Sequence, residues 1–369
     1  MSGRVVVFGA TGYTGRLTVG SLVERGAQAT IAGRDEDRLR TLAAKLGGTR
    51  TAVADVARPA TVRALVDRGD VLVSTVGPFT RLGDPAVAAA IEAGAWYLDS
   101  TGEPPFVRRV FEDFGPRAEA AGTALVTAFG YDFVPGNLAG ALVLREAGEQ
   151  ATRVEVGYFS LGGPGALRGA ASRGTRASLA GVALEPMFAW RDGIREERAA
   201  ARMRSFHVHG RPREALSIGG SEHFALPRLF PGLREVDVYL GWFGTATRAL
   251  HTASRVSPLL ARVPGVRAGL RAAGERAMRR PGRDPDPAAG ARVGTYAVAA
   301  AFDGSGTQLG EVHLSGGDPY ELTGHLLAWG AVRAAAGDLP GTGALGPVEA
   351  FGLNELEAAC AEAGLIRSR

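Results

Sequence analysis

Residues 5–15 read VVVFGATGYTG, an apolar strand that runs directly into a turn with glycines at positions 9, 12 and 15. A helical pattern follows at 16–25. In such a turn the glycines permit a tight bend, close approach of the backbone to a pyrophosphate, and close packing of helix on strand. Free N–H groups at the start of the helix favour the anion. We therefore expect a dinucleotide site here; a helix-start turn without a ligand is the alternative.

Short apolar runs alternate with helical patterns over the first 130 residues. After the opening strand they lie at 29–32, 51–53, 71–74, 97–99 and 124–127. This alternation is typical of βαβ units, which form a doubly wound parallel sheet of the Rossmann type. A dinucleotide at the carboxyl edge of that sheet contacts the glycine turn. The expected contacts are Gly9, Thr11, Gly12, Tyr13, Thr14 and Gly15.

The end of the second strand predicts which cofactor is bound. An acidic residue at this point receives the ribose 2′-hydroxyl of NAD, whereas an arginine accommodates the 2′-phosphate of NADP. Arg34 is the first side chain after the glycine that ends the strand, and Arg38 lies one helical turn further on. Asp35 is either the hydroxyl acceptor or the N-cap of the helix at 36–46. We expect NADP(H), bound by Arg34 and Arg38.

Two further segments end at the same edge of the sheet. The strand at 71–74 is followed by Val76, Gly77 and Pro78, where we expect the nicotinamide. Asp55 follows the third strand, where it reaches the adenine edge or caps the next turn. These four residues complete the predicted cofactor contacts.

Three carboxylates follow strands at this edge and are the candidate catalytic residues: Asp132, Asp99 and Glu103. Carboxylates beside a nicotinamide have perturbed pKa values and can transfer protons. Each also has a structural interpretation. Asp132 caps a helix that starts near Pro135, Glu103 starts a helix at the prolines that follow it, and Asp99 is a satisfied carboxylate at a strand end.

The composition excludes several classes of protein. The chain has 369 residues, 46% hydrophobic and 22% charged, and its net charge of +4 is too small to indicate nucleic-acid binding. Lys45 is the only lysine and lies in a charged helix, which excludes a P-loop and a Schiff-base enzyme. Cys360 is the only cysteine, so no intramolecular disulfide or cysteine-based zinc site forms. With no signal peptide or long apolar segment evident, we expect a cytoplasmic protein.

The single lysine also separates classes of reductase. Extended short-chain dehydrogenases begin with a similar glycine turn, but they protonate the substrate with a tyrosine activated by a lysine four residues later. Thr41 stands four residues before Lys45. The acid-base pair is therefore absent, and this class is excluded.

Three stretches resemble the saccharopine dehydrogenase-like oxidoreductases. They read YLDSTGE at 97–103, AFGYDFVPGN at 128–137 and SRGTRAS at 172–178. The last is similar to a Ser-Gly-Gly-Thr-x-x-Ser stretch of that family, with Arg173 in place of a glycine. The resemblance covers most of the chain and is strongest over 4–140. It implies an NADP-binding oxidoreductase; the family includes trans-acting enoyl reductases of lipid assembly and amino-acid-forming reductases.

From residue 152 onward the pattern changes to strands of period two. They are expected at 153–161, 202–209, 235–242, 292–302 and 308–315, the last two joined by a hairpin at 303–306. With a helix at 179–190, they predict an α+β domain with a mostly antiparallel sheet. Such a domain forms the floor of a substrate cleft and can pair across a homodimer. We expect domains at 1–135 and 136–318, with helices in 319–369 that pack back on the first.

Arginines in the second domain predict an anionic substrate or partner. The loop at 162–178 brings arginines to a helix N-terminus, where they favour a carboxylate or a phosphopantetheine phosphate; a solvated loop is the alternative. The expected substrate contacts are Phe79, Tyr131, Arg173, Thr175 and Arg176. Residues 245–283 carry nine arginines and one acid. Such a stretch rests on an anionic membrane, docks an acidic acyl carrier protein, or forms a helical pair with a solvated face.

These features lead to three hypotheses about function. The first is an NADPH-dependent reductase that passes hydride to an imine or a conjugated double bond of a small or carrier-bound substrate. The second is a trans-acting enoyl reductase of acyl or polyketide chains, and the third is a non-catalytic NADP-binding sensor. His207 and His209 share a strand face, but two ligands without a third predict no metal site.

Overall fold

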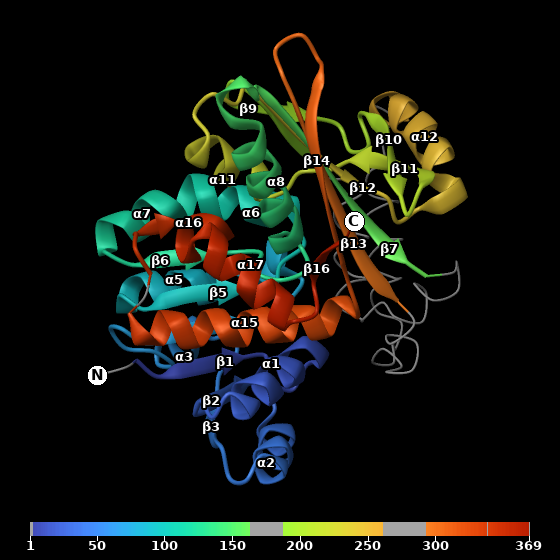
Figure 1. The fold of residues 1–369 in the computed structure, drawn as a ribbon. Coiled ribbons are helices and arrows are strands. Elements are labelled where there is room, and N and C mark those ends of the chain that lie inside the picture. Colours follow the sequence, from blue (N-terminus) through green and yellow to red (C-terminus); the bar gives the residue numbers. More distant parts are fainter. Residues whose placement is uncertain (1–2, 163–186, 261–292, 338, 369) are drawn as a thin grey trace. The chain divides into compact units, whose positions relative to one another are not determined.

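The computed structural model describes residues 3–162, 187–260, 293–337 and 339–368 (Figure 1). The chain divides into two compact units, and the boundary falls within a helix. The first unit contains residues 1–138 and 319–365, and the second contains residues 139–318 and 366–369.

The first unit is built on a seven-stranded sheet in which every pairing is parallel. Its strands, in spatial order, are β15 (Gly343–Ala344), β6 (Ala124–Val126), β5 (Trp96–Asp99), β4 (Val71–Ser74), β1 (Val5–Phe8), β2 (Ala29–Gly33) and β3 (Arg50–Val53). The chain leaves β1 on one side to form β2 and β3, and returns on the other side to form β4. Ligands of such sheets bind at the carboxyl edge where the order reverses, here between β1 and β4.

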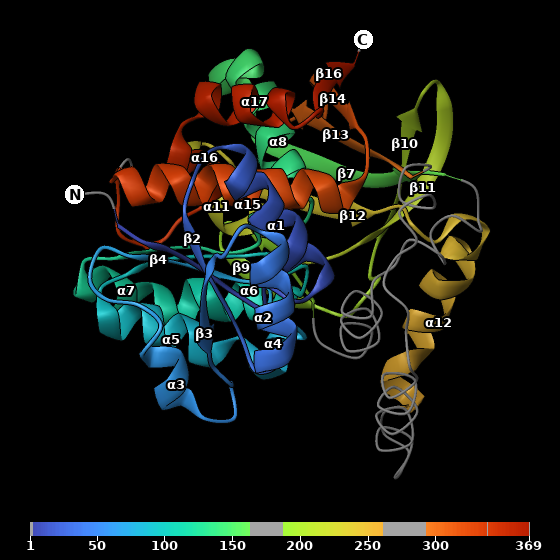
Figure 2. The same cartoon turned by 90° about the horizontal axis from the view of Figure 1, so that it is seen from below.

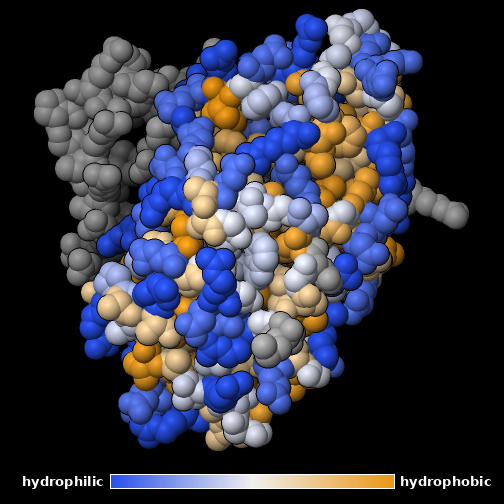
Figure 3. Space-filling model, turned by 90° about the vertical axis from the view of Figure 1, so that its left-hand side faces the viewer, coloured by the Kyte–Doolittle hydropathy of each residue, from blue (hydrophilic) through white to orange (hydrophobic). Residues whose placement is uncertain are grey.

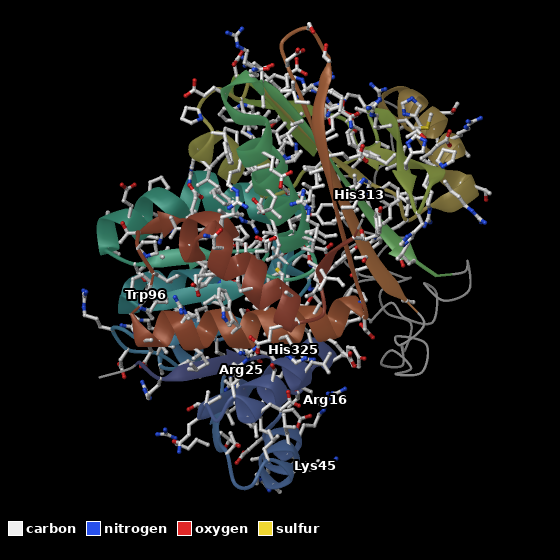
Figure 4. All side chains as sticks on the ribbon, viewed as in Figure 1. Arg16, Arg25, Lys45, Trp96, His313 and His325 are labelled. Atoms are coloured by element: carbon white, nitrogen blue, oxygen red, sulfur yellow. The ribbon has the colours of Figure 1, made fainter. Side chains whose placement is uncertain are left out.

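Helices cover both faces of this sheet. Figure 2 shows α1 (Tyr13–Glu24) and α15 (Pro319–Ala336) on one side of the strands, and α3 (Pro59–Arg63), α5 (Asp84–Ala93) and α7 (Gly115–Ala121) on the other. A Cβ at Gly324 of α15 would lie 2.9 Å from the Leu17 Cβ, so only glycine permits this approach to α1. His325 extends the contact, with its Nδ1 2.9 Å from the Ser21 hydroxyl (Figure 4).

The remaining helical segments of the first unit are short. They are α2 (Glu36–Lys45), α4 (Phe79–Leu82), α6 (Pro104–Arg109), a π-helix (Val110–Phe114), α16 (Pro347–Phe351) and α17 (Leu353–Glu362). Lys45 lies in the last turn of α2 and is exposed (Figure 4), as its charged surroundings predict. Cys360 is buried in α17.

The second unit contains a nine-stranded sheet. Its main path is β10 (Met203–Val208), β11 (Arg211–Ser217), β12 (Glu235–Leu240), β7 (Arg153–Leu161), β13 (Gly294–Phe302), β14 (Gln308–Gly316) and β16 (Ile366–Ser368), and β8 (Met187–Arg191) and β9 (Ile194–Glu197) branch from β12. Among the strands that the structure describes, all pairs are antiparallel except β7 with β12. With the parallel sheet of the first unit, this confirms the predicted fold class.

The described helical segments of the second unit either precede β7 or lie between later strands along the chain. They are α8 (Val134–Ala147), which begins in the first unit, α11 (Glu222–Leu229), α12 (Thr247–Leu260) and 3-10 turns at Gly148–Gln150 and Gly244–Ala246. Gly140 of α8 faces Leu226 of α11 so closely that a Cβ would lie 2.7 Å from its side chain. These two helices therefore pack against each other through a glycine.

Two local predictions for the second unit are wrong. The helix expected at 179–190 does not include residues 187–190, because residues 187–191 form β8, which pairs with β9 through the Asp192-Gly193 turn; residues 179–186 lie outside the described part of the chain. An Asp-Gly pair is a strong hairpin signal. The histidine pair also does not share a strand face, because β10 ends at Val208 and His209 has a φ of 48° in the turn to β11.

No helix within the described ranges is long and apolar enough to cross a membrane. On the face shown in Figure 3, hydrophilic and hydrophobic side chains are interspersed. The largest fully buried side chains include Tyr97, Phe106 and Phe129 in the first unit and Tyr158, Phe159 and Phe188 in the second, so each unit has a core of its own.

Candidate active site

The glycine turn joins β1 to α1 at the reversal point of the first sheet. Gly9 has a φ of +92°, and a Cβ there would lie 2.7 Å from the Thr75 hydroxyl. A Cβ at Gly15 would collide with the Gly9 carbonyl oxygen. Folding alone therefore requires glycine at both positions.

Gly12 differs from these two glycines. It is exposed, it is the N-cap of α1, and no side chain caps the helix start. A Cβ on it would meet only the Gly9 carbonyl oxygen, at 3.2 Å. The N-terminus of α1 is thus open around Gly12, with no side chain within 4 Å of the position that a Cβ would take. This arrangement fits the pyrophosphate of a dinucleotide, which binds at a helix N-terminus and needs close approach to the backbone.

Three arginines lie around this turn. Arg16 of α1 donates from Nη1 to the Thr11 carbonyl oxygen at 2.8 Å, and Arg38 of α2 donates from Nη2 to the same oxygen at 3.2 Å. Figure 4 shows Arg16 on α1. Arg34 is exposed at the end of β2. The end of β2 therefore carries positive charge beside the glycine turn.

Of the two roles that the sequence allows for Asp35, ribose contact or helix cap, the structure shows the helix cap. It is the N-cap of α2, and its Oδ1 accepts a hydrogen bond from the Arg38 backbone N–H at 3.0 Å. The carboxylate is thus oriented towards the helix that it caps. Asp55 makes a comparable local contact, because its Oδ1 accepts from the Ala57 N–H at 3.0 Å. Whether Asp55 also reaches an adenine stays a prediction.

Glu103 holds the segment that follows β4. Its carboxylate accepts hydrogen bonds from the Phe79 N–H at 2.7 Å, the Thr80 N–H at 2.9 Å and the Thr80 hydroxyl at 2.6 Å. Only 1% of Glu103 is exposed. The carboxylate therefore fixes the start of α4, directly after Val76, Gly77 and Pro78, which are partly exposed.

Asp99 is buried at the end of β5 and has no exposed surface. It accepts hydrogen bonds from the Thr101 N–H and the Ala128 N–H, both at 2.9 Å, and from the Thr127 hydroxyl at 2.7 Å. Burial is the largest influence and raises its pKa to about 6, although these hydrogen bonds act in the opposite direction. These contacts match the interpretation of Asp99 as a satisfied carboxylate at a strand end.

Asp132 has different surroundings. The residue as a whole is partly exposed, and burial of the carboxyl is the one cause that raises its pKa to about 7. The helix that follows, α8, begins at Val134, so Asp132 stands one residue before the N-cap position. Its Oδ2 lies over Gly102, where a Cβ would be only 2.5 Å away. Near neutral pH this carboxyl is present in both its acid and its base form.

The segment around Asp132 is anchored from α15. The Thr323 hydroxyl accepts a hydrogen bond from the Tyr131 N–H at 3.0 Å and donates to the Pro319 carbonyl oxygen at 2.7 Å. A Cβ at Gly130 would lie 2.6 Å from the Thr323 methyl carbon. Both Tyr131 and Phe79, expected to contact substrate, are largely buried. Their role as substrate contacts stays a prediction.

Several predicted residues lie outside the described part of the chain. Arg173, Thr175 and Arg176 fall in 163–186, and most of the basic stretch at 245–283 falls in 261–292. Within the described residues, no group of three or more metal-ligating side chains is found.

Sequence reasoning missed Arg16, Gly102 and Thr323. Arg16 was assigned only to the first helix, although a basic residue in the first turn beside a glycine loop is a recognisable signal for an anion. Gly102 stands within the YLDSTGE stretch at 97–103, but the side chain that it accommodates, Asp132, follows a different strand, β6. Thr323 lies almost two hundred residues further along the chain than Tyr131, and no local pattern connects them.

Comparison with known proteins identifies relatives of the first unit. Residues 5–126 match the family described as the saccharopine dehydrogenase NADP binding domain. Over 154 residues the chain is 40% identical to the trans-acting enoyl reductase of Mycobacterium ulcerans, a match covering 40% of this chain and 37% of that protein. For the Mycobacterium leprae enzyme of the same name, 140 residues are 40% identical, covering 36% and 34%. The match thus spans little more than a third of these relatives.

The fold also resembles a solved structure over almost the whole length of both chains. Apo saccharopine dehydrogenase (L-Glu forming) from Saccharomyces cerevisiae matches with a TM-score of 0.58 and 13% identity over 99% of each chain. At this identity the likeness concerns the fold alone. The family match over residues 5–126 confirms the expected cofactor, NADP(H), and the resemblance stated from the sequence.

Proposed function

We propose that this protein, whose residues 5–126 match the saccharopine dehydrogenase NADP binding domain, is an NADPH-dependent reductase. NADPH supplies a hydride when bound. The observation that carries the proposal is the pair of features at one sheet edge: a glycine turn open at Gly12, and a carboxyl at Asp132 whose pKa is raised to about 7.

The first role of the chain is to bind the cofactor. We assign the pyrophosphate to Gly12 and the N–H groups that begin α1, and the 2′-phosphate to Arg34 and Arg38. Asp35 supports this choice, because a carboxylate already engaged as an N-cap is less available to a ribose 2′-hydroxyl. Val76, Gly77 and Pro78 then face the nicotinamide end.

The second role is proton transfer. Reduction of a polarised double bond needs a hydride at one atom and a proton at the other. We assign the proton to Asp132, because a group with a pKa near the working pH is both protonated often enough and acidic enough to donate. Asp99 and Glu103 are assigned no proton transfer, since each is buried and accepts three hydrogen bonds.

The acceptor bond has two candidates. The mycobacterial relatives named trans-acting enoyl reductases support a conjugated carbon–carbon double bond on an acyl chain held by a carrier. An imine is the second candidate, and the same acid would serve it. The alternative to a reductase is a sensor without catalysis, which reduces no bond and requires no reactive carboxyl at the edge of the sheet.

One experiment separates these functions. The protein is mixed with NADPH and either an enoyl thioester or a cyclic imine, and the loss of NADPH absorbance is followed. Reduction of the thioester alone supports an enoyl reductase, and reduction of the imine alone supports an imine reductase. If NADPH binds but neither probe is reduced, the sensor hypothesis replaces the proposal.

A further inference from the structure

The loop of residues 99–103 contacts both parts of the candidate site. We propose that it is a positioning element: Glu103 fixes the cofactor-side residues Phe79 and Thr80, while Gly102 leaves the space that the Asp132 carboxyl occupies. The inference rests on the proposed function, because it explains how the acid and the nicotinamide end are held in one geometry. It assigns these loop residues a role in positioning rather than in proton transfer.

The cofactor side depends on a carboxylate that only accepts hydrogen bonds. Two backbone N–H groups and one hydroxyl point at the two oxygens of Glu103. Glutamine has the same shape, but one of its two ends is an NH2 group that must face an N–H donor. With 1% of Glu103 exposed, water has little access to compensate. The Phe79–Thr80 segment would therefore shift when Glu103 is replaced by Gln.

The acid side depends on a missing side chain. A Cβ at Gly102 would lie 2.5 Å from Oδ2, 3.1 Å from Cγ and 3.3 Å from Cβ of Asp132. The nearest of these atoms is the end of a side chain that can rotate. Alanine at this position should therefore displace the carboxyl while the backbone stays in place.

Asp99 makes the loop a rigid connection between the two sides. Its carboxylate joins the Thr101 N–H within the loop to the Thr127 hydroxyl and the Ala128 N–H in the segment that leads to Asp132. The Thr101 hydroxyl also accepts the Glu103 N–H at 3.1 Å. A shift on either side is thus resisted by the same short segment of chain.

The first test uses Gly102→Ala, with Gly20→Ala as a matched control because a Cβ at Gly20 meets nothing within 4 Å. A displacement of about 1 Å at a catalytic group lowers the rate of reaction by up to about 100-fold. We expect single-turnover hydride transfer to fall about 10- to 100-fold in Gly102→Ala, with NADPH affinity unchanged. Adding Asp132→Asn should cause little further loss. The control should retain the wild-type rate.

The second test does not depend on turnover. Affinities for NADPH and for 2′,5′-ADP, which lacks the nicotinamide, are measured by calorimetry. In Glu103→Gln, NADPH should bind about tenfold more weakly, because a buried donor loses its acceptor, while 2′,5′-ADP binds as in wild type. The control is Glu112→Gln, whose side chain is exposed and pairs with Arg108. It should change neither affinity.

A third measurement covers the case in which Gly102→Ala is less stable. Its melting temperature should then be restored by Asp132→Ala in the same chain, because that change removes the atoms in conflict. Any one of three results would overturn the inference: a melting temperature that Asp132→Ala does not restore, or equally weakened binding of both ligands in Glu103→Gln. The third is an unchanged hydride-transfer rate in Gly102→Ala when Asp132→Asn is slow. If no probe is reduced by the wild type, the proposed function fails, and the binding and melting measurements still decide on the loop.

Discussion

Asp132→Asn should make the folded protein less sensitive to pH. The carboxyl has a pKa of about 7 in the folded protein against 3.8 in an ordinary setting. A folded state that holds a proton more tightly than the unfolded chain loses stability as the pH rises between these two values. Asparagine has a similar shape and does not titrate. The variant should therefore gain stability relative to wild type as the pH increases.

The magnitude follows from the two pKa values. Each pKa unit corresponds to about 1.4 kcal/mol. A change from 3.8 to about 7 therefore sets an upper bound of about 4 kcal/mol on what titration of this carboxyl contributes to the free energy of unfolding. Asp132 is partly exposed, and water around the carboxylate reduces this value. We expect the stability of the variant relative to wild type to rise by about 1–2 kcal/mol between pH 5 and pH 8.

Urea unfolding at pH 5, 6, 7 and 8, followed by circular dichroism, measures this difference directly. Asp113→Asn is a control in the same unit, because Asp113 is exposed on the π-helix. A stability difference between Asp132→Asn and wild type that stays constant from pH 5 to pH 8 would refute the reasoning. It would show that the carboxyl has no raised pKa, and the assignment of Asp132 as proton donor would lose its basis.

Three further outcomes test the cofactor site and the core. Arg34→Ala should weaken the binding of NADPH by about 1.5–3 kcal/mol and the binding of NADH much less, because one charge-assisted contact to the 2′-phosphate is lost. The control Arg40→Ala, which removes a surface partner of Asp37, should change the binding of neither cofactor in the same titration. Gly12→Val should abolish cofactor binding in calorimetry while leaving helical content near wild type, whereas retained binding would make the glycine purely structural. The Cys360 thiol is buried with its pKa raised to about 12. It should react with a thiol reagent only when the protein unfolds, and rapid labelling of the native protein would contradict that burial.

The fold of the first unit could be predicted because its signals are local. A glycine turn between a strand and a helix, with apolar runs at regular spacing, is sufficient to predict strands β1 to β6 and a parallel sheet. The second unit was harder to predict, because several of its strands pair with strands that are distant along the chain. Its β7 lies between β12 and β13, and its last strand, β16, comes from the end of the chain. One error, the helix assigned as far as Trp190, came from giving apolar periodicity more weight than the Asp-Gly turn that follows it.

The sequence places three candidate carboxylates at one sheet edge, with Asp132 as the preferred acid, and the number of donors around each distinguishes them in the structure. Asp99 and Glu103 each accept three hydrogen bonds, so their lone pairs are committed to holding the fold. The Asp132 carboxyl accepts none that is found among the described residues, and burial acts on it without compensation. Apart from the Thr101 N–H, the donors come from Phe79, Thr80, Thr127 and Ala128, which only the folded chain brings near. A residue type at a strand end can therefore predict where an acid lies, but its partners decide whether it can act as one.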